Sequence, residues 1–179
     1  ASADYHADVR CSHEIFKQLS QNYLKFRNTA RYCLGNLDGF DPNTDCVADD
    51  QLQDIDRWAL AALDDLIANT NAGYAVYDFN KVYHAVYNFC VVAMSNFYLD
   101  VTKDRLYCTN GTARKAAQTT MYKILVALDK IIAPILCFTS QEIWDFMPKT
   151  EGMNKYVVFE QMPKAGQYAA DDAFKAKWA

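Results

Sequence analysis

Apolar residues recur three and four positions apart along four long stretches of this chain, and this spacing limits its fold more than any other feature. An α-helix turns once every 3.6 residues, so such spacing places the apolar side chains along one face of a helix. The stretches cover residues 15–37, 55–74, 82–101 and 117–132. Ser12 and Asp78 precede the first and the third, where their short side chains can cap a helix start. The sequence therefore predicts four long amphipathic helices.

Four helices that each bury one stripe pack most simply as an antiparallel bundle, so the predicted fold is all-α. We expect a short fifth helix at Thr139, because Thr139 and Glu142 match a capping box and Pro148 would end the helix. Residues 157–159 are apolar and can form one isolated strand. The predicted bundle spans residues 12–163, and the tail at 164–179 can add a terminal helix.

The charge of the chain is segregated along its length. Residues 13–37 carry a net charge of +3, residues 45–65 of −6 and residues 103–130 of +4, while the whole chain carries −4. The net charge argues against a general nucleic-acid coat, but one surface can be basic on an acidic protein. We interpret the pairs Asp49–Asp50 and Asp64–Asp65 as solvated faces, since adjacent helical residues point ~100° apart.

The sequence lacks the familiar catalytic and cofactor motifs. It has no Gly-rich phosphate loop, no G-x-S-x-G, no H-E-x-x-H, and its six cysteines include no C-x-x-C pair. We therefore assign no catalytic, cofactor-binding or metal-binding residue. The apolar run 131–138 is far shorter than the ~20 residues of a membrane span, and residues 1–6 do not match a secretory signal. We expect a cytoplasmic protein without membrane contact.

Short segments along most of the chain carry a resemblance to a known family. They are residues 8–10 (DVR), 14–18 (EIFKQ), 25–32 (KFRNTARY), 35–37 (GNL), 56–60 (DRWAL), 77–84 (YDFNKVYH), 87–90 (YNFC), 97–100 (FYLD), 103–108 (KDRLYC), 133–136 (APIL) and 139–144 (TSQEIW). Together they closely resemble the anticodon-binding helical bundle of the isoleucyl-tRNA synthetases, within the class I aminoacyl-tRNA synthetases. The run 97–108 is similar to the isoleucyl members in particular, and the resemblance extends to about Pro163.

This resemblance implies a ligase that activates isoleucine with ATP and esterifies tRNA, of which this chain is a fragment. The family's HIGH and KMSKS motifs are absent, so the fragment is expected to bind without catalysing. Its implied partners are the anticodon arm of the isoleucine tRNA and the remainder of the synthetase, with no DNA. ATP belongs to the parent enzyme, and in many members a missing C-terminal region holds zinc. Residues 1–11 would form the junction from the catalytic domain.

The resemblance and the basic segments together nominate a set of tRNA-binding residues: Arg10, Lys17, Arg27, Asn28, Arg31, Lys103 and Arg105. Arg10 precedes the first helix, whose leading amides favour phosphate oxygens. Arg27 and Arg31 are four apart and share a face. Arg10 and Lys17 can meet the tRNA loop while Arg27 and Arg31 meet the stem, or the latter pair can neutralise the acidic second helix. An aromatic or arginine plane near Arg10 is expected, because RNA loops are read by stacking.

The sequence leaves a second function class open. A stand-alone helical scaffold domain could present its acidic second helix to a partner protein.

Overall fold

The computed structural model describes residues 1–168 and 170–178, and in these residues the chain is helical without a strand. This confirms the predicted all-α class. The α-helices are α1 (His13–Asn36), α2 (Asp54–Ala75), α3 (Phe79–Asn88), α4 (Leu99–Val101), α5 (Lys103–Tyr107), α6 (Thr112–Ile132), α7 (Cys137–Phe146) and α8 (Asp172–Lys177). A π-helix, η2 (Phe89–Tyr98), joins α3 to α4, and η1 (Asp49–Gln51) and η3 (Val157–Phe159) are single 3₁₀ turns.

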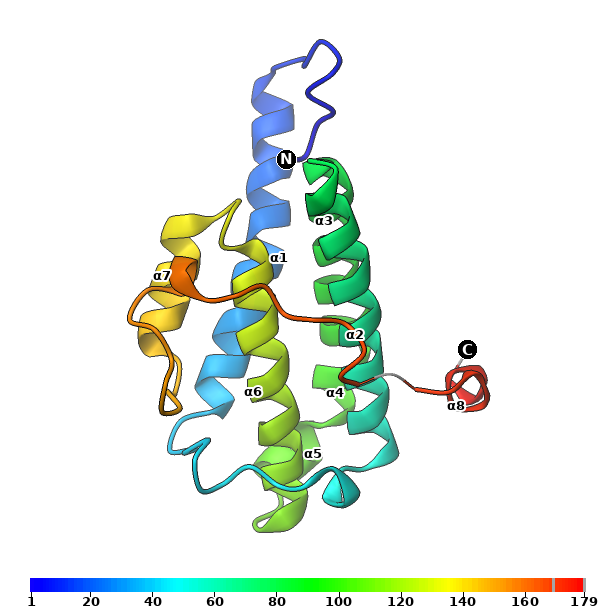
Figure 1. Cartoon of the computed structure of the whole chain (residues 1–179), viewed down its shortest axis with the longest axis vertical. Helices are drawn as coiled ribbons and strands as arrows, with labels where there is room; N and C mark the ends of the chain where they lie inside the picture. The colour runs from blue at the N-terminus through cyan, green and yellow to red at the C-terminus, as the bar shows by residue number, and fades with distance from the viewer. Residues whose placement is uncertain (169, 179) are drawn as a thin grey trace.

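Four rods form the bundle: α1, α2, the continuous rod α3–η2–α4, and α6 (Figure 1). Rods that follow each other in the chain run in opposite directions, as predicted. The connection 37–53 crosses one end of the bundle, so α1 packs against α6 and η2, while α2 packs against α3, η2 and α6. As a result α2 and α6 lie side by side and run in the same direction, which a simple up-and-down bundle would not give.

Helix α1 has a packed half and an overhanging half. Its N-cap is Ser12, as predicted, whose Oγ accepts a hydrogen bond from the Ile15 amide at 3.2 Å. The buried residues of α1, Phe26, Thr29, Ala30 and Cys33, all belong to its second half. The first turns rise beyond the other rods (Figure 1), and the predicted apolar residue Ile15 and its neighbour Phe16 are exposed there. The predicted stripe of α1 is therefore partly buried from Leu19 and fully buried only from Phe26 onward.

The central rod winds differently from the regular helix that the sequence predicts. Asp78 caps α3 as expected, with its Oδ1 accepting from the Lys81 amide at 3.0 Å. From Phe89 onward the rod widens into a π-helix, whose hydrogen bonds span one residue more per turn than those of an α-helix. Residues four and five apart then stack on one face, and this face buries Phe89, Cys90, Met94 and Tyr98.

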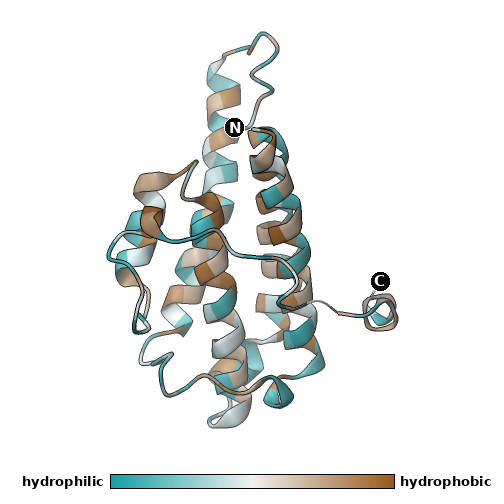
Figure 2. Cartoon of the chain, in the orientation of Figure 1, coloured by the Kyte–Doolittle hydropathy of each residue, from teal (hydrophilic) through white to brown (hydrophobic). Residues whose placement is uncertain are grey.

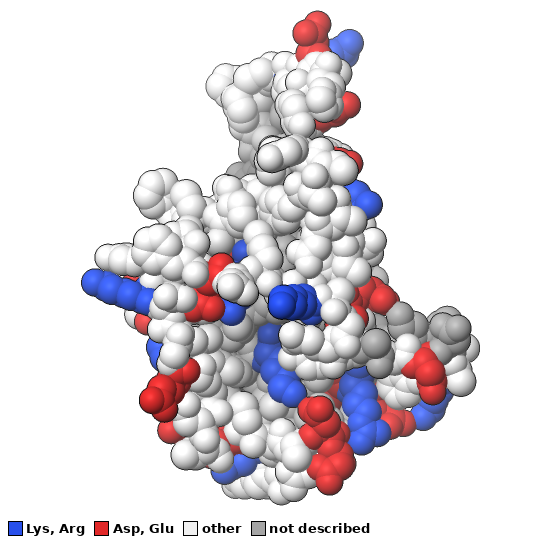
Figure 3. Space-filling model, in the orientation of Figure 1, with Lys and Arg blue, Asp and Glu red and all other residues white. Residues whose placement is uncertain are grey.

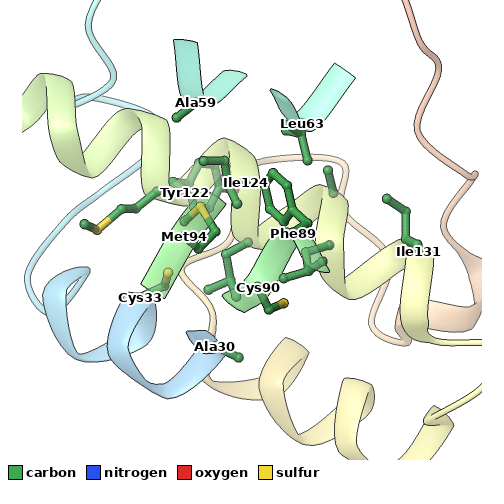
Figure 4. Packing of buried hydrophobic residues seen from close by; sticks show 14 of the residues in the cluster. Ala30, Cys33, Ala59, Leu63, Phe89, Cys90, Met94, Tyr122, Ile124 and Ile131 are labelled. Atoms are coloured by element: carbon green, nitrogen blue, oxygen red, sulfur yellow. The ribbon is translucent and has the colours of Figure 1, made fainter. Parts of the chain in front are cut away.

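The hydrophobic core lies where the four rods meet. Figure 4 shows Ala30 and Cys33 of α1, Ala59 and Leu63 of α2, Phe89, Cys90 and Met94 of η2, and Tyr122, Ile124 and Ile131 of α6 gathered around one centre. Apolar and polar residues alternate along each rod in Figure 2, as expected of helices that bury one side. No helix in the described chain is long and apolar enough to span a membrane.

In the C-terminal third, one local prediction is wrong and one segment that the sequence left open is decided. Helix α7 begins at Cys137, two residues before the predicted capping box, and Thr139 lies inside it with Oγ1 3.2 Å from the Tyr23 hydroxyl. Residues 157–159 form the turn η3 instead of a strand. The Val157 amide donates to Gln141 Oε1 at 3.1 Å, so α7 takes the hydrogen bond that a neighbouring strand would need.

The acidic pair at the middle of α2 also differs from the prediction. The Asp64 side chain is buried, and its carboxylate accepts hydrogen bonds from the amides of Gly166, Gln167 and Tyr168 at 2.9–3.2 Å. Asn71 Nδ2 donates to the Pro163 carbonyl at 2.9 Å. These contacts fix residues 160–168, which we call the strap, across α6 and α2 (Figure 1).

Candidate nucleic-acid interface

Helix α1 presents a row of basic side chains on the side opposite its buried residues. Lys17, Arg27 and Arg31 are exposed and form this row, which we call the basic face of α1, whereas the exposed Lys25 lies about 160° from Arg27 around the helix. At ~100° per residue, Lys17, Arg27 and Arg31 fall within about 80° of one another, and Lys17 to Arg31 spans about 21 Å along the axis. Glu14 is the only acidic residue in α1. The row is long enough to follow several phosphates of one RNA strand.

None of these four side chains forms an ion pair within the described residues. The acidic segment 45–65 finds its cations elsewhere: Lys115 Nζ lies 2.6 Å from Asp45, Lys123 Nζ 3.1 Å from Asp49 and Lys177 Nζ 2.6 Å from Asp54. Figure 3 shows this mixture as blue and red groups side by side over the lower half of one face. The structure thus does not bring Arg27 and Arg31 to the acidic second helix, and the ion-pair alternative for them receives no support.

Arg27 and Arg31 instead border a small cleft between α1 and α7. Its lining includes Glu142 and the exposed ring of Phe146, and its volume is about 140 Å³. No ion pair joins Glu142 to either arginine within the described residues. Both guanidinium groups therefore remain available to an anionic ligand.

Asn28 and Arg31 also line a second cleft, on the side of α1 that faces α5. We call it the Tyr107 cleft; it holds about 390 Å³ and is lined by Asn28, Arg31, Tyr32, Gly35, Asn36 and Tyr107. The Tyr107 hydroxyl donates to that of Tyr32 at 3.4 Å, and its side chain is otherwise exposed. The pKa of Tyr107 is lowered because Tyr32 and Asn36 stabilise its ionised form by hydrogen bonding and the charge of Lys103 favours that form.

Lys103 lies one turn before Tyr107 on α5 and already has a partner. Its Nζ lies 2.6 Å from Asp100 Oδ1 across one exposed turn, and this contact raises the pKa of Lys103. An exposed i,i+3 pair of this kind exchanges readily for a phosphate.

Arg105 points into the bundle instead of outward. Its Nη1 and Nη2 donate to the two oxygens of Asp56 at 3.0 and 2.7 Å, and Nη2 also donates to the Ala113 carbonyl at 3.0 Å. Asp56 is fully buried and accepts a further hydrogen bond of 2.7 Å from the Tyr98 hydroxyl. Because its donors are engaged there, Arg105 is not available to an external phosphate as the sequence predicted.

Arg10 and Lys17 lie at the opposite end of α1 from the Tyr107 cleft. Arg10 is in the exposed loop before the helix and Lys17 in the overhang. The nearby Tyr5 is held against α3: its hydroxyl donates to the Tyr77 carbonyl at 3.1 Å and its ring contacts Phe79. The exposed aromatics beside the arginines of α1 are Tyr107 and Phe146, both near Arg31, while Tyr5 and Phe16 are exposed at the end of the molecule that holds Arg10. Neither Tyr107 nor Phe146 was predicted as a site residue. Tyr107 falls outside the apolar stripes, and this position could have indicated an exposed aromatic side chain.

Comparison with known proteins places this arrangement in a family. Residues 56–178 match the model of the anticodon-binding domain of tRNA ligases. The chain is 53% identical to an isoleucine–tRNA ligase of Syntrophotalea carbinolica over 95% of its length, and 49% identical to one of Caldicellulosiruptor saccharolyticus over 99%. An isoleucine–tRNA ligase of Bacillus mycoides is 44% identical over 99% of the chain.

The chain belongs to the anticodon-binding domain family of tRNA ligases.

This anticodon-binding domain spans about a fifth of the length of those relatives, 19% of the first and 20% of the second. Within its described residues no group of three or more His, Cys, Asp or Glu side chains is placed to hold a metal ion. Its exposed chemistry is charge, amide and aromatic surface, which is suited to binding.

Proposed function

We propose that this domain binds the anticodon arm of an isoleucine tRNA as part of an isoleucine–tRNA ligase. The observation that carries the proposal is the basic face of α1, an exposed row of unpaired cations on an otherwise acidic domain. Each cation that replaces counterions on a phosphate adds sequence-independent affinity, and Asn28 beside Arg27 can add hydrogen bonds to sugar or base. Arg10, Lys17, Arg27, Asn28, Arg31 and Lys103 make up the proposed surface.

The scaffold alternative has no comparable support. It needs a free acidic surface, but Asp45, Asp49, Asp54 and Asp56 pair with cations of this chain, and Asp64 holds the strap. Much of the charge that the sequence offered to a partner protein is used inside the domain.

The parent enzyme supplies the rest of the proposed activity. There, in the cytoplasm, a catalytic domain would use ATP to activate isoleucine while this domain holds the tRNA, and the junction would lie at residues 1–11. Zinc, where present, would lie in the missing regions. We expect the isolated chain to show no isoleucine-dependent exchange of pyrophosphate into ATP. Exchange above background would contradict this division of labour.

Filter binding of transcribed isoleucine tRNA tests the proposal, with the isolated chain and in parallel with the full-length ligase. Neutralising three to five phosphates of a locally single-stranded loop gives a slope of about −2 to −4 in log affinity against log salt. A domain that binds random RNA equally well, or without salt dependence, does not have the proposed function.

Charge reversals locate the surface. Arg10→Glu, and Arg27→Glu combined with Arg31→Glu, should each weaken binding by about 1–3 kcal/mol per lost contact, with the melting temperature unchanged. Lys115→Glu is the matched control, because it reverses an exposed lysine that already pairs with Asp45. If Lys115→Glu weakens tRNA binding as much as the α1 variants, net charge and not this surface sets the affinity.

A further inference from the structure

The Tyr107 cleft combines features that charge alone does not require. We propose that it binds one unpaired nucleobase of the RNA, with the ring of Tyr107 as the stacking surface. The inference rests on the proposed function and adds to it a defined base-binding site.

The aromatic part of the site is both fixed and open. The Tyr107 side chain is 64% exposed, and its ring contacts no other ring within the described residues. Its hydroxyl is held by Tyr32, which donates in turn to the Leu99 carbonyl at 3.5 Å. A ring anchored at its edge with free faces is what base stacking needs, and stacking on an aromatic ring contributes about 1–3 kcal/mol per base at single-stranded sites.

The polar part matches the edge of a base. Asn28 and Asn36 each carry a carboxamide, which donates and accepts as base edges do. Asn36 Nδ2 spends one hydrogen on the Tyr32 carbonyl at 2.9 Å, which fixes the amide and leaves Oδ1 and the second hydrogen. The Asn28 side chain is exposed and has no hydrogen bond in the described part of the chain. The cleft volume of about 390 Å³ lies within the range of small-ligand sites.

Gly35 forms the open part of the cleft lining. It lies in the last turn of α1, where glycine disfavours the helix relative to alanine. A Cβ at this position would meet no atom within 4 Å, so the bundle gives no packing reason for its absence. A flat nucleobase lying against the helix backbone would need the space that a Cβ takes, which gives a reason for glycine here.

The ligand has a preferred direction along α1. The carbonyls at the end of the helix disfavour phosphate, and the last turn carries no basic residue. Phosphates therefore belong beside Arg27 and Arg31, with the base over Gly35 and Asn36. This places an unpaired loop base at the Arg31 end of α1, the reverse of the order expected from the sequence.

Two RNA probes separate stacking from charge. One is a hairpin of the isoleucine anticodon stem and loop, and the other is a blunt duplex of the same stem. Tyr107→Ala should weaken binding of the hairpin about five- to a hundred-fold and leave that of the duplex unchanged, whereas Tyr107→Phe keeps the ring and should bind like the parent. Tyr77→Ala is the matched control, since Tyr77 is similarly exposed but lies in the connection between α2 and α3, at the opposite end of the bundle from α5.

A second pair of variants tests the cleft without removing the ring. Gly35→Leu fills the cleft and should weaken hairpin binding as Tyr107→Ala does, and Gly35→Ala, which adds one methyl group where the base would lie, should weaken it less. The open space lets both variants fold, and both should melt at or above the parent temperature because glycine disfavours the helix. If both Tyr107→Ala and Gly35→Leu bind the hairpin like the parent, or Tyr107→Ala weakens the duplex equally, the base site is overturned. If the parent still binds the hairpin with salt dependence and Arg27→Glu/Arg31→Glu loses that binding, the proposed function stands without the base site. If the parent binds the hairpin no better than it binds random RNA, both the proposed function and the base site are wrong.

Discussion

The basic face of α1 and the acidic segment 45–65 are similarly dense in charge, yet the bundle treats them in opposite ways. The four cations of α1 have no ion-pair partner in the described chain and point away from the core. In the acidic segment, Asp45, Asp49, Asp54 and Asp56 meet cations from distant parts of the chain, and Asp64 meets backbone amides. Charge density therefore does not distinguish a binding surface from a structural one. The presence of internal partners does.

The largest effect is expected where the acidic segment enters the core. Asp56→Ala leaves Arg105 without its bidentate partner, the Tyr98 hydroxyl without an acceptor and the Gln53 amide without its cap at 3.0 Å. Breaking a buried pair from one side costs about 3–5 kcal/mol, so the free energy of unfolding in urea should fall by that amount. The exposed Asp50→Ala serves as the control. A loss below about 1 kcal/mol would show that this charge is not structural.

Asp129 sharpens the comparison, because it is a buried carboxyl with no cation in hydrogen-bond contact among the described residues. Both its oxygens lack a partner in the described chain, and it lies between α6 and α7. Burial raises the pKa of Asp129 to about 7, against smaller opposing effects of Ser140 and Lys149. The folded state then holds the proton more tightly than the unfolded state, so stability is highest below pH 4 with respect to this group and falls as the pH rises to about 7.

A difference of about 3 in pKa corresponds to about 4 kcal/mol, an upper limit for this loss. Asp129→Asn should remove that part of the pH dependence and be more stable than the parent at pH 8. Thermal melts of both proteins from pH 5 to 8 measure it. If the melting temperatures of the two proteins change with pH in parallel, Asp129 is solvated or paired.

The strap should respond more weakly. Asp64→Ala leaves the amides of Gly166, Gln167 and Tyr168 without their acceptor, at a cost of about 1–3 kcal/mol. Limited proteolysis should then cut the strap faster than the rods, and Asp64→Asn, which keeps one acceptor oxygen, should fall between. An unchanged cleavage rate would assign the strap's order to other contacts, such as Asn71 with Pro163.

The smallest effect on stability is expected on the basic face of α1. Arg27→Ala with Arg31→Ala should change the free energy of unfolding by no more than about 0.5 kcal/mol, because no internal partner is lost. Lys123→Ala loses Asp49 and a contact over the Tyr168 ring at 5.4 Å, so it should cost more, up to about 1 kcal/mol. If the arginine variant is the less stable of the two, both regions are structural and the contrast fails.

The sequence predicted the rods well because helical spacing is a local property. Ser12 and Asp78 cap their helices as predicted, and the rods lie where the apolar stripes are. The wrong N-cap at Thr139 and the undecided segment at Val157 have a shared reason: both residues form hydrogen bonds with distant parts of the chain, Thr139 with Tyr23 and Val157 with Gln141. The π-helix was also missed, although the unusual breadth of the apolar stripe between Phe89 and Tyr98 is what that winding produces.

The candidate site was less predictable because exposure and pairing depend on the assembled bundle. Arg105 and Lys103 are two residues apart, yet one enters the core to reach Asp56 and the other stays at the surface with Asp100. Tyr107 meets Arg31 and Asn28 only because α5 lies beside the end of α1. No local pattern encodes such a meeting.

The overhang of α1 has a kinetic consequence. Backbone amides exchange with solvent at a rate set by local opening, and opening is easiest where few apolar contacts hold a helix. The turns around Phe16 should thus exchange much faster than those around Cys33, although both belong to one continuous helix. Any neighbour that covers Ile15 and Phe16 would slow the fast half alone, so the ratio of exchange rates between the two halves reports directly on docking at this end.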